Sequence, residues 1–281
     1  MKPVEKYGNV AWVAGSPIDH SLSPVIHNSA FEGAGLPHQY FAIEVKPEEL
    51  TDFVGNLQSM GMIGANFTLP LKNAVCEVVE DQTPAVETIG AANTLFRRNS
   101  GEFALDNTDV YGFEKLVEPW GERIRSEPVL ILGAGGASRA CLFALDRLNC
   151  PRIYLWNRTR ESAQTLSEQY PYDITVLSDS ELSEGEFEAG VVVNTTSLGL
   201  NESDGSPFPE QQIRDDMVGV DLIYNRETKF VQDFGEYGSD SIGGLGMLVH
   251  QAAGAWKRWF DTTPNVDIMK QAALDYLQDD Q

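Results

Sequence analysis

The feature that most constrains the fold is an apolar strand that runs into a glycine-rich turn and then a helix. The run Pro-Val-Leu-Ile-Leu-Gly-Ala-Gly-Gly-Ala-Ser covers Pro128–Ser138, and helical periodicity follows over Arg139–Leu148. Gly133 permits a tight turn, Gly135 lets the backbone approach a pyrophosphate, and the free N–H groups at the helix start bind the anion. The segment therefore predicts a Rossmann-type domain that binds a dinucleotide.

The residues after the next predicted strand favour NADP over NAD. About 20 residues beyond the glycines, an NAD site presents an acid to the ribose 2′-hydroxyl. This chain has Asn157-Arg158-Thr159-Arg160 there instead. A carboxylate would repel a 2′-phosphate, whereas a guanidinium attracts it with planar, forked donors. The alternative to cofactor binding is that the two arginines are simply the first residues of a helix, which is the end where the helix dipole disfavours cations.

Short apolar runs alternate with helical patterns along almost the whole chain, which is typical of βαβ units and a parallel sheet. In the first half we expect strands at Val10–Ala14, Gln39–Val45 and Gly64–Leu69, helices over Lys46–Met60 and Leu71–Val79 and from Ser23-Pro24 with Ser23 as N-cap, and a hairpin of Asn93–Arg98 and Glu102–Asn107. In the second half we expect strands at Val129–Leu132, Arg152–Trp156, Ile174–Val176, Val191–Asn194 and Val218–Ile223, and an apolar helix over Leu245–Phe260.

Length and loops complete this organisation. At roughly 100–200 residues per domain, a chain of 281 residues suggests two lobes. The pattern breaks around Pro119–Pro128, where a new α/β series begins. Two acid-rich segments, Asp179–Glu188 and Asn201–Asp216, are expected to be solvated loops.

Composition excludes several classes of partner. With 42 acidic and 20 basic residues the formal charge is −22, so neither a nucleic acid nor an anionic membrane is expected to bind. Three cysteines without a CxxC pattern favour a reducing cytoplasm over a disulfide scaffold. The apolar run near the N-terminus is too short for a signal peptide or a membrane span. The four histidines lack ligand spacing, so no metal site is expected.

Four polar strings fall at the ends of predicted strands. They cover Ser16–Pro24, Asn66–Lys72, Ala91–Thr94 and Asp106–Asp109. In the first, two serine hydroxyls beside a helix N-terminus offer a place for a carboxylate, although capping the helix is their commoner role. Considered singly, a lysine or an aspartate at such places is usually a surface charge.

Taken in order, these strings closely resemble the shikimate dehydrogenase family over the whole chain. The motifs that carry the resemblance are SPIDHSLSP, GANFTLPLK, GAANTL, DNTD, ILGAGGASRA, NRT, NTTSLG, DLIYN and GLGMLVHQA. The resemblance implies an NADP-binding lobe facing a substrate lobe, with the site in the cleft. It also implies that NADPH reduces 3-dehydroshikimate to shikimate, a step of chorismate and aromatic amino-acid biosynthesis.

The resemblance also implies two domains and a set of site residues. An N-terminal α/β substrate domain with a mainly parallel sheet comprises 1–112 and 245–281, and the Rossmann-type NADP-binding domain comprises 113–244. Lys72 and Asp109 match the catalytic pair, although the sequence leaves open which of them passes the proton. Substrate-binding positions are Ser21, Ser23, Thr68, Asn93, Tyr224 and Gln251. Cofactor-binding positions are Gly133, Ala134, Gly135, Gly136, Ala137, Ser138, Asn157, Arg158, Thr159, Thr195 and Gly244.

Alternatives remain at two levels. The Ser138 hydroxyl either donates to a phosphate or merely caps the helix. At the level of function, a quinate/shikimate dehydrogenase of broader specificity uses the same scaffold, and a non-catalytic protein that responds to NADP or shikimate would retain the cleft. The presence of both Lys72 and Asp109 argues against the last of these. The expected partner is a small molecule, bound by a monomer or homodimer.

Overall fold

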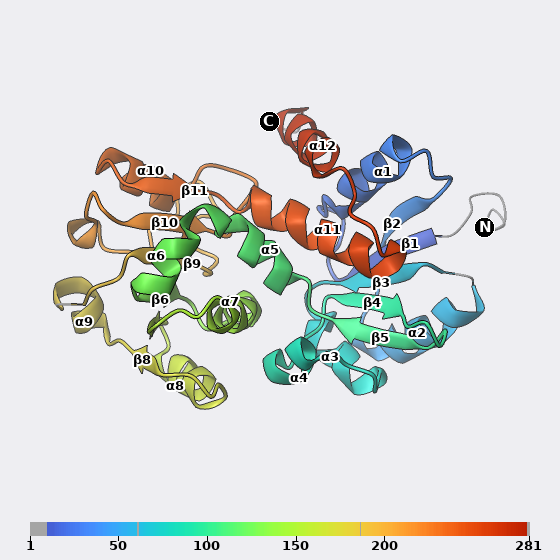
Figure 1. Ribbon diagram of the computed structural model, residues 1–281, viewed down its shortest axis with the longest axis horizontal. Coiled ribbons are helices and arrows are strands. Elements are labelled where there is room, and N and C mark those ends of the chain that lie inside the picture. Colours follow the sequence, from blue (N-terminus) through green and yellow to red (C-terminus); the bar gives the residue numbers. More distant parts are fainter. Residues whose placement is uncertain (1–9, 61, 186, 280–281) are drawn as a thin grey trace. The chain divides into compact units, whose positions relative to one another are not determined.

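The computed structural model describes residues 10–60, 62–185 and 187–279, and it contains two compact units, each built on one sheet (Figure 1). The first unit is formed by Met1–Gly112 with Val249–Gln281, and the second by Phe113–Leu248. The α/β class expected from the sequence, with parallel sheets and a Rossmann-type unit, is confirmed. The expectation about the N-terminal segment concerns residues 1–9, which lie outside the described residues. None of the described helices is long and apolar enough to cross a membrane.

The sheet of the first unit has five strands in the order β2-β1-β3-β4-β5. Three strands are parallel, and the last two form the antiparallel hairpin expected from the sequence. The strands are β1 (Val10–Gly15), β2 (Gln39–Glu44), β3 (Gly64–Phe67), β4 (Thr94–Arg97) and β5 (Phe103–Asp106). In this hairpin the first residue of β4 and the last residue of β5 both lie at the edge of the sheet where β1 and β3 end.

Helices cover both faces of this sheet. Figure 1 shows α2, α3 and α4 on one face, and α1 with α12 on the other. Apolar side chains from β1, β3, α2 and α3 form a continuous core on the first of these faces, with Phe67, Leu71 and Val75 almost fully buried. The bounds are α1 (Ser23–Gly33), η2 (Pro47–Glu49), α2 (Leu50–Ser59), α3 (Leu71–Val78), α4 (Pro84–Ile89), α5 (Asp109–Leu116), α11 (Leu245–Phe260) and α12 (Val266–Asp279).

A glycine in β3 lets α11 approach the sheet closely. The Trp259 indole donates its N–H to the carbonyl of Leu95 at 3.0 Å. A Cβ atom added at Gly64 would lie 2.3 Å from Trp259 Nε1 and 2.4 Å from that carbonyl oxygen. Because contacts this short do not occur between real atoms, only glycine fits at this point of the strand.

His27 lies in an aromatic cluster beside this contact. Its ring stacks on Tyr40 with the centroids 4.3 Å apart, and Trp259 packs against it at 5.2 Å. Neither ring nitrogen has a hydrogen-bond partner among the described residues. Burial lowers the pKa of His27 from 6.5 to about 3, because the charged imidazolium cannot be hydrated there.

This burial predicts a loss of stability in mild acid. The unfolded chain binds a proton at His27 near pH 6.5, whereas the folded chain does so only near pH 3, so stability is full above pH 6.5 and falls as the pH drops toward 3. Between pH 6.5 and pH 5, His27 lowers the free energy of unfolding by about 2 kcal/mol. Urea unfolding of the wild type and of His27→Phe at pH 7.5 and pH 5 measures it, since carboxylates titrate equally in both proteins. The wild type should lose more than the variant, and equal losses would contradict this account. His20→Gln, at an exposed histidine, is the matched control.

The second unit contains a six-stranded, fully parallel sheet in the order β11-β10-β9-β6-β7-β8. The chain starts in the middle at β6, builds outward to β8, and returns to β9 on the other side of β6. The strands are β6 (Val129–Leu132), β7 (Ile153–Trp156), β8 (Ile174–Val176), β9 (Val191–Asn194), β10 (Val218–Asp221) and β11 (Asp240–Ile242). The helices are η3 (Glu118–Trp120), α6 (Gly121–Ser126), α7 (Gly136–Arg147), α8 (Arg160–Glu168), α9 (Asp179–Glu184), η4 (Glu210–Gln212) and α10 (Lys229–Glu236).

One acid-rich segment is helical where a loop was expected. Asp179–Glu184 forms α9, so the prediction of a solvated loop there is wrong. Ser178 caps the helix: its hydroxyl accepts from the N–H of Glu181 at 3.2 Å, and the Glu181 carboxylate accepts from the N–H of Ser178 at 2.7 Å. Leu182 then anchors the short helix in the core. A reciprocal capping box and one buried leucine are enough to stabilise this six-residue segment, in which the other five residues are polar, as a helix.

Candidate active site

Most of the predicted substrate residues of the first unit lie at one edge of its sheet. β1 and β3 are parallel, so the loops that follow them leave the sheet on the same side. Asn66 of β3 pairs with Thr94 of β4, and Thr94 pairs with Asp106 of β5, which places the start of β4 and the end of β5 at that edge. The edge carries Ser21 and Ser23 after β1, Thr68 and Lys72 after β3, Asn93 before β4, and Asp109 after β5.

Lys72 and Asp109 form an ion pair at this edge. Lys72 Nζ lies 2.6 Å from Asp109 Oδ2, and the two side chains are 24% and 13% exposed. Lys72 is in the first turn of α3, and Asp109 begins α5, where the helix dipole favours a negative charge. A partly buried pair is screened less than a surface pair. The pair therefore holds an ammonium group in a fixed direction while leaving it accessible.

Asn93 orients the other oxygen of Asp109. Its Nδ2 donates to Asp109 Oδ1 at 2.9 Å, and its Oδ1 accepts from the backbone N–H of Thr108 at 2.8 Å. A backbone N–H only donates, so this contact fixes which end of the Asn93 amide is oxygen. Both carboxylate oxygens of Asp109 are consequently held, one by Asn93 and one by Lys72.

Behind Asn93 lies a buried polar network that the sequence analysis did not single out. Thr94 Oγ1 donates to Asn93 Oδ1 at 2.8 Å, accepts from Asn66 Nδ2 at 3.0 Å, and lies 3.0 Å from Thr108 Oγ1. Asn66, Thr94 and Thr108 are all almost fully buried. The available signal was an Asn-Thr pair at each end of one hairpin, Asn93-Thr94 and Asn107-Thr108.

Ser23 takes a different position from the one expected. α1 begins at Ser23 itself, with Leu22 as N-cap and no side-chain cap, so the prediction that Ser23 caps the helix is wrong. The Ser21 hydroxyl supplies an oxygen instead, because it accepts from the Ser23 N–H at 3.3 Å. Both serines are half-buried at the helix N-terminus.

Thr68 and Gln251 complete the predicted substrate residues of this unit. The Thr68 N–H donates to the carbonyl of Ala14 at 2.9 Å. A Cβ atom added at Gly15 would lie 2.4 Å from Thr68 Cγ2, so the end of β1 directly contacts the chain after β3. Gln251 lies on α11 and is half-buried. It is the one predicted residue of this unit that is not placed by a strand end.

In the second unit, the glycine-rich turn lies at the point where the sheet order reverses. β6 is flanked by β7 and β9, and the carboxyl ends of all six strands lie at one edge because all are parallel. Ligands of open α/β sheets bind outside the carboxyl ends of the strands at such a switch point. The turn after β6 and Thr195 after β9 meet there.

The turn has the geometry that a pyrophosphate requires. Gly133 has φ +112°, a conformation that L-residues with a side chain rarely adopt. Cβ atoms added at Gly135 or Gly136 would meet nothing within 4 Å, so open space lies against the backbone at the start of α7. The first-turn N–H groups of that 12-residue helix lack carbonyl partners within the helix, and they favour an anion.

Asn157, Arg158 and Thr159 follow β7 at the same edge. Asn157 Nδ2 donates to the carbonyl of Thr159 at 2.8 Å, and Thr159 is the N-cap of α8. Arg158 is exposed, and no hydrogen bond or ion pair holds its guanidinium within the described part of the chain. An unpaired guanidinium beside the turn is suited to a phosphate.

Thr195, Tyr224 and Gly244 follow β9, β10 and β11 at this edge. A buried pair supports the first two loops, since Asn194 Nδ2 donates to Asp221 Oδ1 at 3.1 Å. Burial raises the pKa of Asp221, partly offset by its hydrogen bond from Thr228. Burial also raises the pKa of Tyr224, so this hydroxyl keeps its proton and can donate it to an anion.

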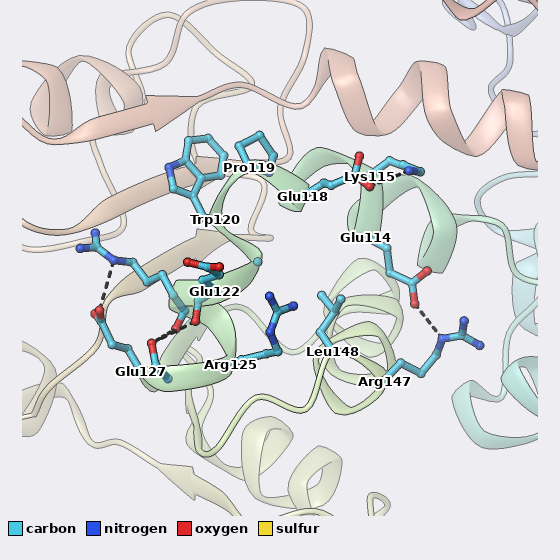
Figure 2. A pocket seen from close by; sticks show the side chains of 13 residues that line it. Glu114, Lys115, Glu118, Pro119, Trp120, Glu122, Arg125, Glu127, Arg147 and Leu148 are labelled. Carbon is cyan, nitrogen blue, oxygen red and sulfur yellow. Dashed lines mark hydrogen bonds and ion pairs between the residues drawn. The ribbon is translucent and has the colours of Figure 1, made fainter.

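A surface pocket of about 960 Å³ lies elsewhere in the second unit, lined from α5, η3, α6 and α7 (Figure 2). None of the site residues predicted from the sequence lines it. Its charges pair with one another, with 2.7 Å between Lys115 Nζ and Glu118 Oε1 and between Arg147 Nε and Glu114 Oε1. Acidic and basic lining residues are equal in number, so the lining has no net formal charge.

Three family models match the chain in succession. Residues 13–95 match the shikimate dehydrogenase substrate binding domain, 115–227 match shikimate / quinate 5-dehydrogenase, and 244–274 match the shikimate 5′-dehydrogenase C-terminal domain. Lys72 and Asn93 lie within the first match, and the glycine-rich turn lies within the second. Asp109 lies between the first two.

Whole-length relatives agree with these matches. The shikimate dehydrogenase (NADP(+)) of Bartonella quintana is 38% identical over 272 residues, which is 95% of this chain and 92% of that protein. The crystal structure of shikimate dehydrogenase from Aquifex aeolicus has 34% identity and a TM-score of 0.86, covering 94% of this chain and 97% of that one. Shikimate 5-dehydrogenase from Thermus thermophilus, solved with NADP(H) and shikimate, has 32% identity and a TM-score of 0.86, covering 95% and 99%.

Proposed function

The chain belongs to the shikimate dehydrogenase family, and we propose that it catalyses the NADPH-dependent reduction of 3-dehydroshikimate to shikimate, within chorismate and aromatic amino-acid biosynthesis. The observation that carries the proposal is the Lys72–Asp109 ion pair, held at 2.6 Å at the carboxyl edge of the first sheet. An accessible ammonium group fixed in this way is what the reduction of a ketone requires beside the carbonyl oxygen.

The pair acts on the ketone of the substrate. When bound, NADPH would supply the hydride for the ring carbonyl carbon, so that negative charge would develop on the carbonyl oxygen. Lys72 beside that oxygen stabilises the negative charge, and the pair supplies the proton that converts the oxygen to a hydroxyl. Asp109 holds the ammonium group in a fixed direction, and Asn93 keeps Asp109 in place. In the reverse direction the same pair accepts the proton.

The remaining polar residues bind the rest of the substrate. Hydroxyls of Ser21, Ser23 and Tyr224 donate to its carboxylate, because neutral hydroxyl donors can bind an anion without requiring a countercharge. Thr68, Asn93 and Gln251 bind its ring hydroxyls. We therefore assign the substrate to the domain of residues 1–112 and 245–281.

The cofactor residues fit NADP. The open space against Gly135 and Gly136 admits a pyrophosphate, and the unpaired Arg158 suits a 2′-phosphate. Within the turn Gly133–Ala137, the backbone N–H groups of Gly136 and Ala137 would hold the pyrophosphate, while Asn157, Arg158 and Thr159 would hold the adenosine ribose. The domain of residues 113–244 is thus assigned to the cofactor, with Gly244 at its end.

Isotope transfer tests the reaction directly. The chain is incubated with 3-dehydroshikimate and NADPH that carries two deuterium atoms at nicotinamide C4, and the product is identified by mass spectrometry and NMR. Shikimate with one deuterium at the former carbonyl carbon is expected. Failure to form shikimate, or shikimate without deuterium, would contradict the proposal.

The acidic surface predicts an unusual dependence on salt. The chain carries a formal charge of −22, yet NADP and the substrate carboxylate are both anions. The Debye length falls from about 30 Å at 0.01 M salt to about 8 Å at 0.15 M, so long-range repulsion is screened more than close contacts are. We expect kcat/KM for NADP to rise, or at least not to fall, between about 10 and 150 mM monovalent salt. A steep monotonic fall would show that local positive potential dominates.

A further inference from the structure

Ser138 and Thr195 join the glycine-rich turn to the end of β9. Ser138 Oγ lies 2.6 Å from Thr195 Oγ1 and 3.1 Å from the backbone nitrogen of Gly135. Thr195 Oγ1 lies 2.8 Å from the carbonyl oxygen of Leu132, the last residue of β6. Ser138 is fully buried and Thr195 is half-buried. Two hydroxyls therefore connect β6, the turn, α7 and β9.

The direction of each hydrogen bond follows from the chemistry of its partners. A carbonyl oxygen only accepts, so the Thr195 hydroxyl donates its single proton to the carbonyl oxygen of Leu132. The contact between the two hydroxyls must then be donated by Ser138. A backbone N–H only donates, so Ser138 accepts from Gly135. The chain of hydrogen bonds runs from Gly135 through Ser138 and Thr195 to Leu132.

This arrangement excludes a direct contact between the Ser138 hydroxyl and a phosphate. The one proton of that hydroxyl is already donated to Thr195, and an ionised phosphate offers only acceptors. The N–H of Gly135 is likewise occupied by Ser138. The groups left for a pyrophosphate are backbone N–H groups farther along the turn and in the first turn of α7.

Thr195 also fills the space beside the strained glycine. A Cβ atom added at Gly133, whose φ is +112°, would lie 2.6 Å from Thr195 Oγ1. The backbone N–H of Thr195 donates to the same Leu132 carbonyl at 2.9 Å. Gly133 is fixed from the other side, because its N–H donates to the carbonyl of Trp156 at 2.7 Å. The turn is thus held from both neighbouring strands.

We infer that Ser138 and Thr195 are positioning residues that hold the glycine-rich turn in the conformation that binds the pyrophosphate, and that neither hydroxyl is a ligand of the cofactor. The inference rests on the proposed binding of a dinucleotide. A turn held in its bound conformation before the ligand arrives loses less conformational entropy on binding. The two residues should act as one unit, since breaking either hydrogen bond releases the same turn.

A double-mutant cycle tests this coupling. Dissociation constants for NADP are measured by calorimetry for the wild type, Ser138→Ala, Thr195→Val and the double variant. Each single change should raise Kd about 10-fold, the usual scale for one lost hydrogen bond. In the double variant, Kd should also rise about 10-fold. Two independent contacts would instead raise it roughly 100-fold. Thr195→Ser keeps the hydroxyl and should restore tight binding, and Ser167→Ala on α8 is the matched control.

A fragment of NADP shows whether the variants weaken binding of the pyrophosphate alone or of the whole cofactor. Adenosine 2′-monophosphate has no pyrophosphate, so its Kd should stay within about twofold of wild type in every variant. Additive effects, an unchanged Kd for Thr195→Val, or equal weakening of the fragment would each overturn the inference. Thr195→Ala replaces the valine variant if that protein does not fold, as judged by its thermal unfolding.

The same measurements show whether a failure concerns the role of the two hydroxyls or the assignment of NADP as cofactor. NAD carries the same pyrophosphate, so the cycle is repeated with NAD. A wild type that binds NAD as tightly as NADP would contradict the NADP assignment, while the ratios between variants would still test the two hydroxyls. A wild type that binds neither dinucleotide would overturn both.

Discussion

Replacement of Lys72 by alanine is expected to lower kcat by about 10²–10⁴-fold while changing KM little, because general acid–base catalysis acts mainly in the transition state. Lys72 contacts Asp109 directly and is still 24% exposed, so it is held in place without being closed off from a substrate. Initial rates of shikimate oxidation measure the change. Lys270→Ala, at an exposed lysine on α12, is the matched control and should behave as wild type.

Two further variants distinguish the role of the positive charge at position 72 from the role of proton transfer. Lys72→Arg keeps a cation beside Asp109, but a guanidinium holds its proton too firmly to transfer it. We expect this variant also to retain less than a tenth of the wild-type kcat. Asp109→Asn should lower kcat similarly and also weaken substrate binding. A Lys72→Ala protein that retained more than about a tenth of the wild-type kcat would remove Lys72 from the catalytic pair.

Replacement of Arg158 by alanine is expected to weaken NADP binding by about 1.5–3 kcal/mol, the usual range for a hydrogen bond to a charged group. NAD lacks the 2′-phosphate, so its Kd should scarcely change. Calorimetric titration with both dinucleotides measures the difference. Arg152→Ala removes an exposed arginine that precedes β7, at the other end of the strand from Arg158, and serves as control. Equal losses for NADP and NAD would show that Arg158 does not contact the 2′-phosphate.

Much of the fold could be predicted because its strands are apolar and its turns carry glycine or proline. The expected helix over Leu245–Phe260 agrees with α11 to the residue, since apolar positions recur along its whole length. β11 could not be found in this way: Asp240–Ile242 has three residues, none of them fully buried, and pairs with β10 at the sheet edge. The segment Pro119–Pro128, which looked like a break, forms η3 and α6 inside the second unit. Short elements depend on tertiary contacts that periodicity does not contain.

The site could be predicted only as far as its motifs reached. Lys72 and Asp109 are 37 residues apart, and the residue types alone would have marked each as a surface charge. Their contact depends on the register that pairs Asn66 with Thr94 and Thr94 with Asp106. No local pattern specifies that register. The supporting network of threonines was missed for the same reason, because its members become neighbours only when the hairpin closes.

The most direct test of the central claim is the matrix of initial rates for shikimate and quinate, each with NADP and NAD, measured with one preparation of the full chain. The Lys72–Asp109 pair predicts turnover, and Arg158 predicts that NADP is used better than NAD. The largest kcat/KM should therefore be that for shikimate with NADP. Comparable rates with quinate and NAD would indicate an enzyme of broader specificity, and no turnover in any of the four combinations would contradict the account.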